Sequence, residues 1–498
     1  MNEIKTIVVV GAGSAGLLSA MTLKRAFSRL DVKIVHSPDI PVIGVGESTT
    51  AIFPPFLHSS LGIDFVEFFT AVQASWKLGV RFVWGDPKDS HFNYTFDSCM
   101  STKSPHLRKA APYYCLSDWS DASPSWALMD RGLSPCFRRP DGQTAAQVAF
   151  GYHIENQAFI DFLTKKAVEC GIETISGNVA DATQDESGNV EQLLLTEGRS
   201  ITADLFVDCT GFGSQLLRGK LDETFVSYRD SLFCDRAVVG QWQRSDPRDP
   251  VLPYTTTETM DHGWCWRIDF PSHVTRGYVF CSAFCSDAEA TAEFKSANPQ
   301  LNDDIRVVPF TSGRYEGFWR KNVVAIGNSC GFVEPLEATA LHLVVEQIRM
   351  VCRLLSETDL RLLPEMESIA NRQYRVLWDE VRDFLAVHYR FNRKRDTPFW
   401  QHCRENTDLA GAADFVELYQ RFGPSTLGST TLSGENVFGY DGFTTLLVGQ
   451  RVPTDYQPLL FESDAKSWLD HQNRIREYIQ AALPMDVALK QFGTATLD

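Results

Sequence analysis

Long apolar runs are missing from this sequence of 498 residues. No segment approaches the ~20 consecutive apolar residues that a membrane-spanning helix needs, and the apolar run after residues 1–5 is too short for the core of a secretory signal peptide. The sequence therefore predicts a protein that does not span a membrane, and it predicts a cytoplasmic location.

Positive charge is also scarce. Lysine and arginine total 47 against 63 aspartate and glutamate residues, so the formal net charge is -16. Nucleic acids and anionic membrane surfaces would repel such a chain. We expect neither as a partner.

Paired cysteine motifs are the third absence. The 12 cysteines are scattered, mostly within apolar patterns, and Cys281 and Cys285 have no matching second pair. No CxxC pair occurs, so the spacing predicts reduced core thiols and no zinc or other metal site. The hydrophobic fraction of 44% and the charged fraction of 22% are those of a folded protein, and the length predicts two closely packed domains.

The N-terminal residues carry the first functional motif. Residues 4–10 are a β-branched apolar run, residues 11–16 read GAGSAG, and residues 17–23 continue with apolar positions of a helix. Strand, GxGxxG and helix form a dinucleotide-binding βα unit, in which glycines let the backbone approach a pyrophosphate at the helix N-terminus. The next strand ends in His36, with Asp39 shortly after, and either residue could contact the ribose.

Two later segments fit the same kind of site. Residues 41–49 form a second glycine-rich turn, which is either a loop with a capping hydroxyl or a source of backbone N–H groups for a flavin ring. Residues 204–208 are typical of a buried strand, and its terminal acid, Asp208, would face the cofactor.

The stretch 327–341 is where we expect the chemistry. A short apolar strand precedes it, and apolar residues at helical spacing follow from Leu341. Pro335 suits the approach to a helix start, where free N–H groups can receive a flavin edge or an anion. Glu337 is then either a cap that favours the helix dipole or a catalytic carboxylate.

Two further features have a structural and a functional interpretation. Lys77 lies in an apolar, strand-like run, where it is either a solvated charge on an edge strand or a functional ammonium group. Between residues 220 and 310 the pattern is one of alternating strands, which places Trp264, Trp266 and Ile268 on one face. That stripe belongs either to the core or to the wall of a site.

Five motifs occur together and in order, and they lead to a family resemblance. They are GxGxxG at Gly11, Gly44-Val45-Gly46-Glu47-Ser48-Thr49, Asp208-Cys209-Thr210-Gly211-Phe212, Trp264-Cys265-Trp266-Arg267-Ile268, and Phe332-Val333-Glu334-Pro335-Leu336-Glu337. With them the chain resembles the flavin-dependent tryptophan halogenases from its N-terminus into its helical C-terminal part. The tryptophan motif, WxWxIP in the family, is the most specific, because it separates halogenases from ordinary flavin monooxygenases.

The resemblance implies a fold and a division into domains. We expect an α/β fold with a Rossmann-type FAD-binding domain of the flavin monooxygenase and halogenase kind, additional β-sheet, and a helical C-terminal subdomain. The first domain would span residues 1–360, with aromatic-rich, irregular insertions at about 85–150 and strands at 220–310. The subdomain would span residues 361–498, with a mobile Gly/Ser/Thr-rich loop at 423–442.

The resemblance also implies roles for individual residues. Lys77 and Glu337 fall on the family's catalytic lysine and glutamate, Thr339 and Ala340 on its halide site, and Trp264, Trp266 and Ile268 on the tunnel wall. Phe92, Tyr94, Phe96 and Phe443 would line the substrate pocket. The cofactor-binding residues would be Gly11, Gly13, Ser14, Ala15, Gly16, His36, Asp39, Gly46, Glu47, Ser48, Thr49, Asp208, Gly327, Pro335 and Leu336.

The implied mechanism begins with reduced FAD. FADH2 would react with O2 to give a C4a-hydroperoxide, and chloride, bromide or iodide near Thr339 would attack it and release hypohalous acid. The acid would pass the tryptophan wall to Lys77, which would present it to an electron-rich indole or phenol, while Glu337 would take the ring proton. Lys77 and Glu337 would therefore face a common cavity. Since no second GxGxxG follows a strand, a separate flavin reductase would supply FADH2.

This sequence departs from the family pattern in several places. Asp269 replaces the proline of WxWxIP, and Ala338 and Ala340 replace the serine and glycine of the family's FxxPxxSxG. The aromatic clamp for an amino acid is not evident at residues 442–445, and the pocket histidine falls on Tyr94. We therefore expect a halogenase that does not act on free tryptophan. The alternatives are a flavin-dependent aromatic hydroxylase or a noncatalytic flavin-binding protein, and a homo-oligomer is compatible with each.

Overall fold

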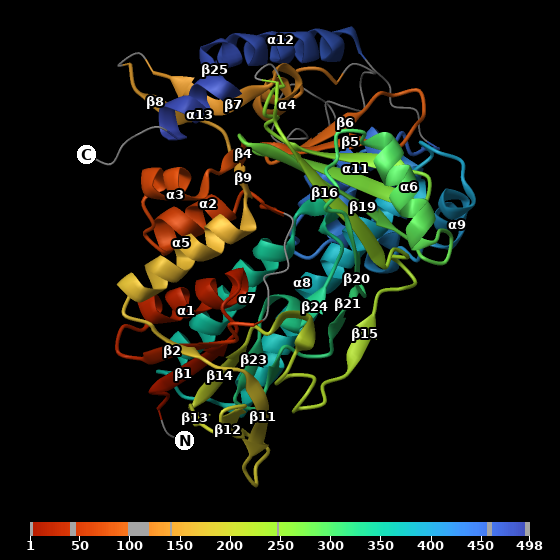
Figure 1. Cartoon of the computed structure of the whole chain (residues 1–498). Coiled ribbons are helices and arrows are strands. Elements are labelled where there is room, and N and C mark those ends of the chain that lie inside the picture. Colours follow the sequence, from red (N-terminus) through yellow and green to blue (C-terminus); the bar gives the residue numbers. More distant parts are fainter. Residues whose placement is uncertain are drawn as a thin grey trace. The chain divides into compact units, whose positions relative to one another are not determined.

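The computed structural model describes residues 3–39, 46–97, 119–139, 142–246, 249–455 and 461–493 (Figure 1). The chain divides into two units, and each unit is made of three chain segments. The first unit comprises Met1–Gln73, Ile154–Tyr228 and Thr311–Trp378, and the second comprises Ala74–His153, Arg229–Phe310 and Asp379–Asp498. These units follow other boundaries than the predicted domains at 1–360 and 361–498, and that division stays a prediction. No helix in the described ranges is long and apolar enough to cross a bilayer.

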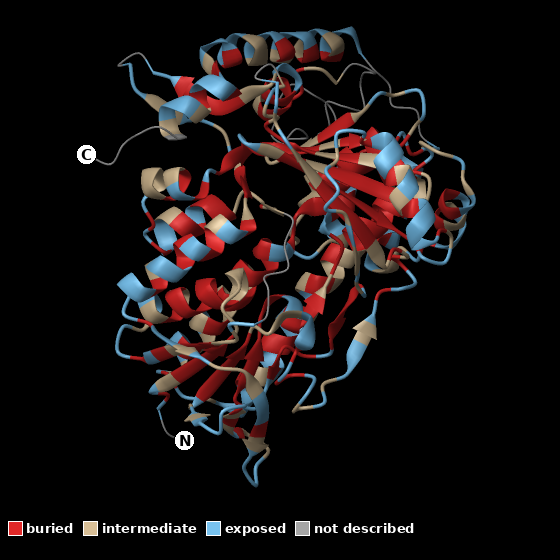
Figure 2. Ribbon diagram, in the orientation of Figure 1, coloured by how far each residue is buried: buried red, intermediate tan, exposed pale blue. Residues whose placement is uncertain are grey.

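A six-stranded sheet forms the centre of the first unit, in the order β10-β2-β1-β14-β23-β22. All its neighbours pair in parallel except β22 and β23. The central strands are apolar and buried, as expected for a parallel sheet covered on both faces (Figure 2). The bounds are β1 Thr6–Val10, β2 Asp31–His36, β10 Glu173–Ser176, β14 Leu205–Asp208, β22 Trp319–Arg320 and β23 Val323–Ala325.

Helices cover one face of this sheet. The helix α1 (Ser14–Ala26) packs on β1 and β2, and α5 (Asn156–Glu169) and α7 (Ala340–Glu357) pack against α1 (Figure 1). The helix α5 begins at Asn156, because the Glu155 carboxylate accepts a hydrogen bond from the Ala158 N–H at 2.7 Å and caps the helix. Helices α2 (Phe53–Pro55) and α3 (Phe65–Val72) and the π-helical turn Phe56–Ser60 complete this layer.

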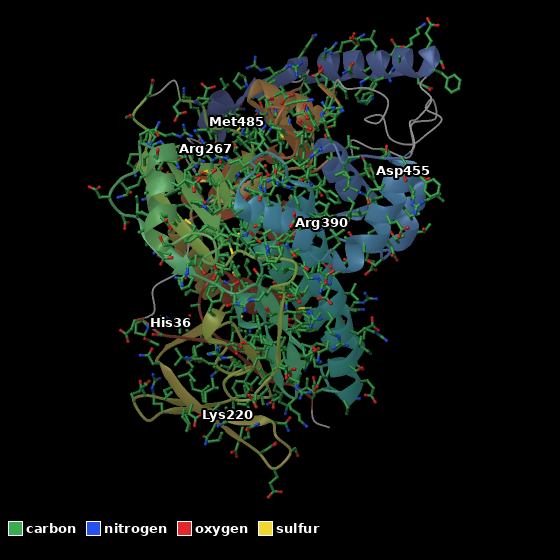
Figure 3. All side chains as sticks on the ribbon, turned by 90° about the vertical axis from the view of Figure 1, so that its right-hand side faces the viewer. His36, Lys220, Arg267, Arg390, Asp455 and Met485 are labelled. Carbon is green, nitrogen blue, oxygen red and sulfur yellow. The ribbon has the colours of Figure 1, made fainter. Side chains whose placement is uncertain are left out.

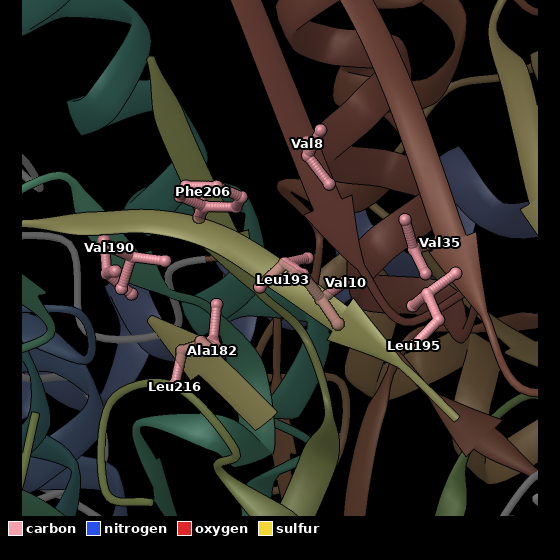
Figure 4. Packing of buried hydrophobic residues seen from close by; sticks show 10 residues of the cluster. Val8, Val10, Val35, Ala182, Val190, Leu193, Leu195, Phe206 and Leu216 are labelled. Carbon is pink, nitrogen blue, oxygen red and sulfur yellow. The ribbon is translucent and has the colours of Figure 1, made fainter. Parts of the chain in front are cut away.

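A small antiparallel sheet covers the other face. It consists of β11 (Val179–Gln184), β12 (Val190–Leu195) and β13 (Ser200–Thr202). Leu193 and Leu195 of this sheet join one buried cluster with Val8, Val10 and Phe206 of the parallel sheet (Figure 4). A third sheet, formed by β15 (Phe225–Ser227), β21 (Gly313–Tyr315) and β24 (Gly331–Phe332), also belongs to the first unit.

The second unit is built on a seven-stranded sheet in the order β20-β16-β19-β18-β17-β5-β6. Its pairs are antiparallel except for β17 and β5. The bounds are β5 Gly79–Val83, β6 Phe92–Thr95, β16 Arg236–Gln243, β17 Thr255–Met260, β18 Gly263–Asp269, β19 His273–Phe280 and β20 Arg306–Pro309. The strands predicted between 220 and 310 are therefore confirmed.

The strand β18 shows the predicted alternation. Trp264, Trp266 and Ile268 share one face, whereas Cys265 on the other face joins an apolar cluster with Phe294 of α6 (Asp287–Ala297). All three residues of the stripe are buried. The stripe is thus set on a covered face of the sheet.

The segment 85–150 is more regular than its composition predicts. Besides β6 it holds α4 (Pro124–Arg131), β7 (Leu133–Arg138) and β8 (Thr144–Ala146), and residues 98–118 and 140–141 lie outside the described ranges. Helix α4 starts at a clear signal, since the Ser123 hydroxyl accepts from the Trp126 N–H and proline occupies the first helical position. The expectation of an irregular segment was wrong for these parts.

The C-terminal part is mainly helical in the described ranges, as predicted. The long helix α8 (Pro364–Phe391) begins in the first unit and ends in the second. Its apolar residues at helical spacing are buried, namely Trp378, Val381, Phe384, Leu385 and Tyr389. The segment 423–442 contains a 3-10 turn and the start of α11, not only a loop. The remaining elements are α9 Pro398–Asn406, α10 Ala413–Phe422, α11 Gly439–Gly449, α12 Glu462–Tyr478, β25 Ala482–Pro484 and α13 Met485–Gly493.

Candidate active site

The turn between β1 and α1 has the shape that a dinucleotide requires. Gly11 has φ +110°, and a Cβ there would lie 2.4 Å from the Cys209 carbonyl oxygen. A Cβ at Gly16 would lie 1.9 Å from the Gly11 oxygen, whereas none of the described atoms comes within 4 Å of one at Gly13. Gly11 and Gly16 thus allow the tight turn, and Gly13 leaves the approach to the helix open.

The first turn of α1 suits a phosphate. Gly13 occupies the N-cap position without a side-chain hydrogen bond, and the first turn, which starts at Ser14 and Ala15, holds no acidic residue. The free N–H groups and the positive end of the helix dipole therefore stay available to an anion.

The two candidates for the ribose contact differ in their surroundings. His36 is the last residue of β2 (Figure 3) and pairs with Ser176. The Asp39 carboxylate accepts a hydrogen bond from the Asn178 side-chain amide at 3.0 Å. One carboxylate oxygen of Asp39 thus accepts a hydrogen bond within the protein, and either His36 or Asp39 stays a candidate for the ribose contact.

Asp208 holds a loop of its own chain. Its buried carboxylate accepts hydrogen bonds from the N–H and hydroxyl groups of Thr210 and from the N–H groups of Leu216 and Leu217, at 2.7 to 3.1 Å. Burial raises the pKa of Asp208, and these hydrogen bonds oppose the rise. We therefore assign Asp208 to positioning the loop beside Gly11, and a direct cofactor contact stays a prediction.

The second glycine turn is described from Gly46 onward, and residues 41–45 lie outside the described ranges. Glu47 and Ser48 form a short strand and do not open a helix, since α2 starts only at Phe53. Burial raises the pKa of Glu47 to about 7. Thr49 is fully buried next to it.

A hydrogen bond ties this turn to α7. The Thr50 hydroxyl lies 2.9 Å from Nδ1 of His342, which is buried near the start of that helix. Burial, together with the charge of Arg349, lowers the pKa of His342 to about 4. The imidazole is therefore neutral at physiological pH and links two predicted cofactor segments.

The predicted strand, turn and helix around Glu337 are present. The strand β23 is followed by a 3-10 turn that begins at Gly327 (φ +71°), and a second 3-10 turn, Pro335–Glu337, carries Pro335 and Leu336. Glu337 is buried, and α7 begins three residues later with Thr339 as its N-cap. The interpretation of Glu337 as the cap of this helix was therefore wrong.

Thr339 and Ala340 form the N-terminal end of this long helix. No side-chain cap hydrogen bond is formed there, and the buried Thr339 hydroxyl has no hydrogen-bond partner among the described residues. The exposed Ala340 adds no bulk. Free N–H groups and an unused hydroxyl at a helix N-terminus are suited to a halide ion.

Lys77 is the most unusual side chain of the second unit. It lies in β4 (Ser75–Lys77), which pairs with β9 (Gly151–Ile154), and it is 0% exposed. Its Nζ atom lies 5.4 Å from the centre of the Phe96 ring. A solvated edge charge is therefore excluded, because a lysine is almost never fully buried without a specific reason.

A neutral histidine lies beside this lysine. His153 contacts the hydroxyl of Ser75 through Nδ1 at 3.4 Å and that of Thr255 through Nε2 at 2.9 Å. Because Ser75 donates its proton to the carbonyl of Asp269, we assign the proton of His153 to Nδ1, and Thr255 then donates to Nε2. Burial and the charge of Lys77 lower the pKa of His153 well below its usual range.

The tryptophan pair lies on the neighbouring sheet. The rings of Trp264 and Trp266 are 6.0 Å apart and inclined by 54°. Trp266 faces Gly277 of β19, where an added Cβ would lie 2.0 Å from two ring carbons. The missing side chain at Gly277 therefore makes the space for the indole.

The four predicted pocket rings separate into two groups. Phe92 stacks on Phe82 at 5.1 Å and packs against Gly449 of α11, and its contact with a substrate stays a prediction. Tyr94 and Phe443 both pack around Phe384, at 5.7 and 4.9 Å. Those two and Phe96, beside Lys77, stay candidates for a substrate contact.

Comparison with known proteins identifies the family. The profile of the family described as tryptophan halogenase matches residues 6–465. The tryptophan 7-halogenase KtzQ of Kutzneria sp. (strain 744) is 31% identical over 463 residues, which cover 87% of this chain and 85% of that protein.

The chain belongs to the tryptophan halogenase family.

Solved structures agree with this family assignment. MibH, a lanthipeptide tryptophan 5-halogenase, superposes with a TM-score of 0.89 at 35% identity over 99% of this chain and 94% of its own. Tar14, a tryptophan C-6 flavin-dependent halogenase, gives 0.87 at 27% identity over 99% and 100% of the two chains. The predicted fold is thus confirmed, and this tryptophan halogenase family member is a flavin-dependent halogenase, an oxidoreductase that relies on a separate flavin reductase.

The site residues of this halogenase fall into both units. Lys77, the tryptophan wall and Tyr94, Phe96 and Phe443 belong to the second unit, whereas the glycine turns, Glu337 and Thr339 belong to the first. A cavity shared by Lys77 and Glu337 stays a prediction.

Sequence reasoning missed some residues around Lys77. The sequence pattern alone assigned no role to His153, Ser75 or Thr255. Their one signal was polar character within apolar strands, as in Thr255-Thr256-Thr257.

Proposed function

We propose that this enzyme halogenates an electron-rich aromatic ring of the indole or phenol type. It would use FADH2, O2 and a halide ion, and hypohalous acid would be the halogenating agent that Lys77 directs. The observation that supports this proposal most is the complete burial of Lys77 beside an aromatic ring, in a member of the tryptophan halogenase family.

FAD is the cofactor that the first unit fits. Gly11, Gly13 and Gly16 would hold its pyrophosphate at the start of α1, and His36 or Asp39 its ribose. The turn at Gly46–Thr49 and the stretch from Gly327 to Leu336 would approach the flavin ring. When bound and reduced, the flavin supplies hypohalous acid from O2 and the halide.

The start of α7 is the proposed halide site. Backbone N–H groups at Thr339 and Ala340 would bind chloride, bromide or iodide, with the Thr339 hydroxyl as a further donor. Alanines in place of the family's serine and glycine, at 338 and 340, change the side chains around this site. We expect bromide to be used at least as well as chloride.

The tryptophan wall would keep organic substrates away from the flavin. Trp264 and Trp266 are both buried, and their rings lie side by side on one face of β18. Since a hydroxylase needs its substrate next to the flavin, such a wall favours halogenation over hydroxylation.

Lys77 would receive the hypohalous acid. Its ammonium can donate a hydrogen bond to the acid, or its amine can carry the halogen as a haloamine. Because His153 next to it is neutral, Lys77 is not paired there with a second cation. In either form the lysine would fix where the halogen meets the ring.

Glu337 would act as the general base. The ring carbon forms a bond to the halogen of HO–X while the O–X bond breaks, the oxygen takes a proton from the Lys77 ammonium and leaves as water, and the cationic ring then loses its proton to the Glu337 carboxylate. Its burial in a 3-10 turn would hold the carboxylate in place.

The substrate is proposed to be other than free tryptophan. Tyr94 occupies the position of the family's pocket histidine, and its ring packs on Phe384. The name of MibH shows that a tryptophan in a lanthipeptide is a substrate within the structural neighbours. A tryptophan inside a peptide therefore belongs among the substrates to be tried.

The test is a panel of halides and substrates. Purified enzyme, FAD, a flavin reductase and NADH are incubated with chloride, bromide or iodide and with indole, a phenol, tryptophan or a tryptophan-containing peptide, and products are read by mass spectrometry. We expect brominated indole or phenol and little halogenated free tryptophan. A hydroxylated product without halogen would replace the proposal with a flavin-dependent hydroxylase.

A further inference from the structure

One face of the seven-stranded sheet carries two polar atoms that are buried and unused. The Trp266 indole and the Thr275 side chain are only 6% and 3% exposed. Neither the indole N–H nor the threonine hydroxyl has a hydrogen-bond partner in the part of the chain that the structure describes. Buried donors of this kind are normally satisfied, so both groups remain available to a small partner.

The register of the sheet brings the two residues to neighbouring positions on one face. Trp266 of β18 pairs with Gly277 of β19, and Ile268 pairs with Thr275. Residues two apart on a strand share a face, so Thr275 is the diagonal neighbour of Trp266. The indole lies over Gly277, two residues from Thr275 on β19, and the ring carbon Cε2, which is bonded to the indole nitrogen, is among the three atoms nearest a Cβ added at Gly277.

A line of polar groups continues from this point to Lys77. On the other side of Ile268 the register places Thr255 of β17, whose hydroxyl contacts Nε2 of His153 at 2.9 Å. His153 in turn feels the charge of Lys77. All these residues belong to the second unit.

We propose that the Trp266 indole N–H and the Thr275 hydroxyl form a binding site for hypohalous acid on its way to Lys77. This inference rests on the proposed function. HO–X is small and neutral, so its burial carries no charge penalty. Its oxygen accepts from the indole, and its O–H donates to the Thr275 oxygen, or the oxygen accepts from both groups.

The same face offers a matched control. Thr257 flanks Trp266 on β17, opposite Gly277, and is fully buried. Its hydroxyl already donates to the Arg81 carbonyl at 3.4 Å. Thr257 therefore has the size, burial and strand environment of Thr275 but an occupied hydroxyl.

The experiment measures how much of the hypobromous acid brominates indole and how much escapes from the enzyme into solution. The variants Thr275→Val, Thr275→Ser, Trp266→Phe and Thr257→Val are assayed with FAD, a reductase, bromide and indole. Brominated indole is measured by mass spectrometry, and escaped hypobromous acid is trapped in solution by monochlorodimedone. The ratio of escaped to delivered halogen does not depend on how much oxidant each variant produces.

We expect Thr275→Val and Trp266→Phe each to raise this ratio roughly 2- to 10-fold, the effect of one lost neutral hydrogen bond. Thr275→Ser keeps the hydroxyl and should restore the wild-type ratio, and Thr257→Val should stay close to it. An unchanged ratio in both Thr275→Val and Trp266→Phe would overturn the proposal and assign the two donors to an ordinary buried water. An equal rise in Thr257→Val would also overturn it, because the effect would then come from packing.

This outcome is separate from the test of function. If the wild-type enzyme brominates no substrate, the proposed function fails. If it brominates indole while the ratio is insensitive to Thr275 and Trp266, only the binding site fails. Thermal unfolding of each variant shows that the compared proteins are folded.

Discussion

At the scale of single residues, the burial of Lys77 is the observation that best separates its two interpretations, a solvated charge and a functional ammonium group. A lysine in a run of apolar residues is ambiguous in a sequence. A lysine with 0% exposure has lost the hydration of its charge, and other interactions must offset that free-energy cost. The Phe96 ring offers a cation–π contact, and the neutral His153 offers dipoles in place of a second charge. The cost of burying this group supports our proposal that Lys77 takes part in the chemistry.

The first prediction concerns the Lys77→Met variant. Methionine has a similar length and no charge, so stability should be unchanged or higher by about 1–4 kcal/mol, as for other buried charges replaced by apolar groups. Halogenation should fall by about a hundredfold or more. Urea unfolding and mass spectrometry of products measure both. Lys88→Ala, in the same unit, is the control, and undiminished halogenation in Lys77→Met would remove Lys77 from the mechanism.

The second prediction concerns the Glu337→Gln variant. The amide keeps the shape of the carboxylate but cannot take a proton, so turnover should fall by about 10²- to 10⁴-fold. Escaped hypohalous acid should rise in the same assay, because the oxidant is still made. Glu346→Gln, on α7, is the matched control. Equal losses in both variants, with lower melting temperatures, would assign Glu337 to structure alone.

At the scale of elements, the start of α7 joins several predicted functions. Thr339 and Ala340 form the N-terminal end of the helix, where we propose the halide site. One turn later, Nδ1 of His342 forms a hydrogen bond with the hydroxyl of Thr50, next to the glycine turn. A partly buried hydrogen bond therefore connects that turn to the helix. The sequence did not predict this link, since His342 and Thr50 are far apart along the chain.

The third prediction follows from the low pKa of His342. Between pH 6.5, the ordinary pKa of histidine, and about pH 4, the unfolded chain binds a proton at His342 and the folded chain does not. The free energy of unfolding therefore falls as the pH falls through this range. Relative to wild type, His342→Gln should gain about 2 kcal/mol on moving from pH 7.5 to pH 5. Chemical denaturation of flavin-free protein at both pH values measures this. A difference between the two proteins that does not change with pH would show that His342 titrates normally.

The elements also show how far a sequence can be interpreted. Periodicity and glycine motifs predicted β1, α1, β14, β18 and α7, because these depend on local patterns. The burial of Lys77 could not be predicted in this way, because it comes from the pairing of β4 with β9 across a long separation in sequence. The packing of Phe92 against Gly449 could not be predicted for the same reason, since Gly449 lies on the helix α11, far away in the sequence.

At the scale of the whole molecule, the chain has one dinucleotide-binding turn. No second GxGxxG follows a strand in the sequence, so the enzyme offers no predicted place for NAD(P)H. The fourth prediction is that enzyme, FAD, NADH, bromide and indole give no brominated product in air. Adding a reductase, or FAD reduced by light, should restore the product. Bromination with NADH alone would show that the chain reduces flavin itself.

The interleaving of the two units has a consequence for how this chain folds. The last segment of the first unit ends at Trp378, after two long excursions into the second. During synthesis the parallel sheet therefore cannot be completed until β23 is made, which happens long after β1 and after β14, the strand that pairs with β23 in parallel. Most of the polypeptide must leave the ribosome before either unit can close, and truncating the gene before residue 378 would leave no complete unit to purify.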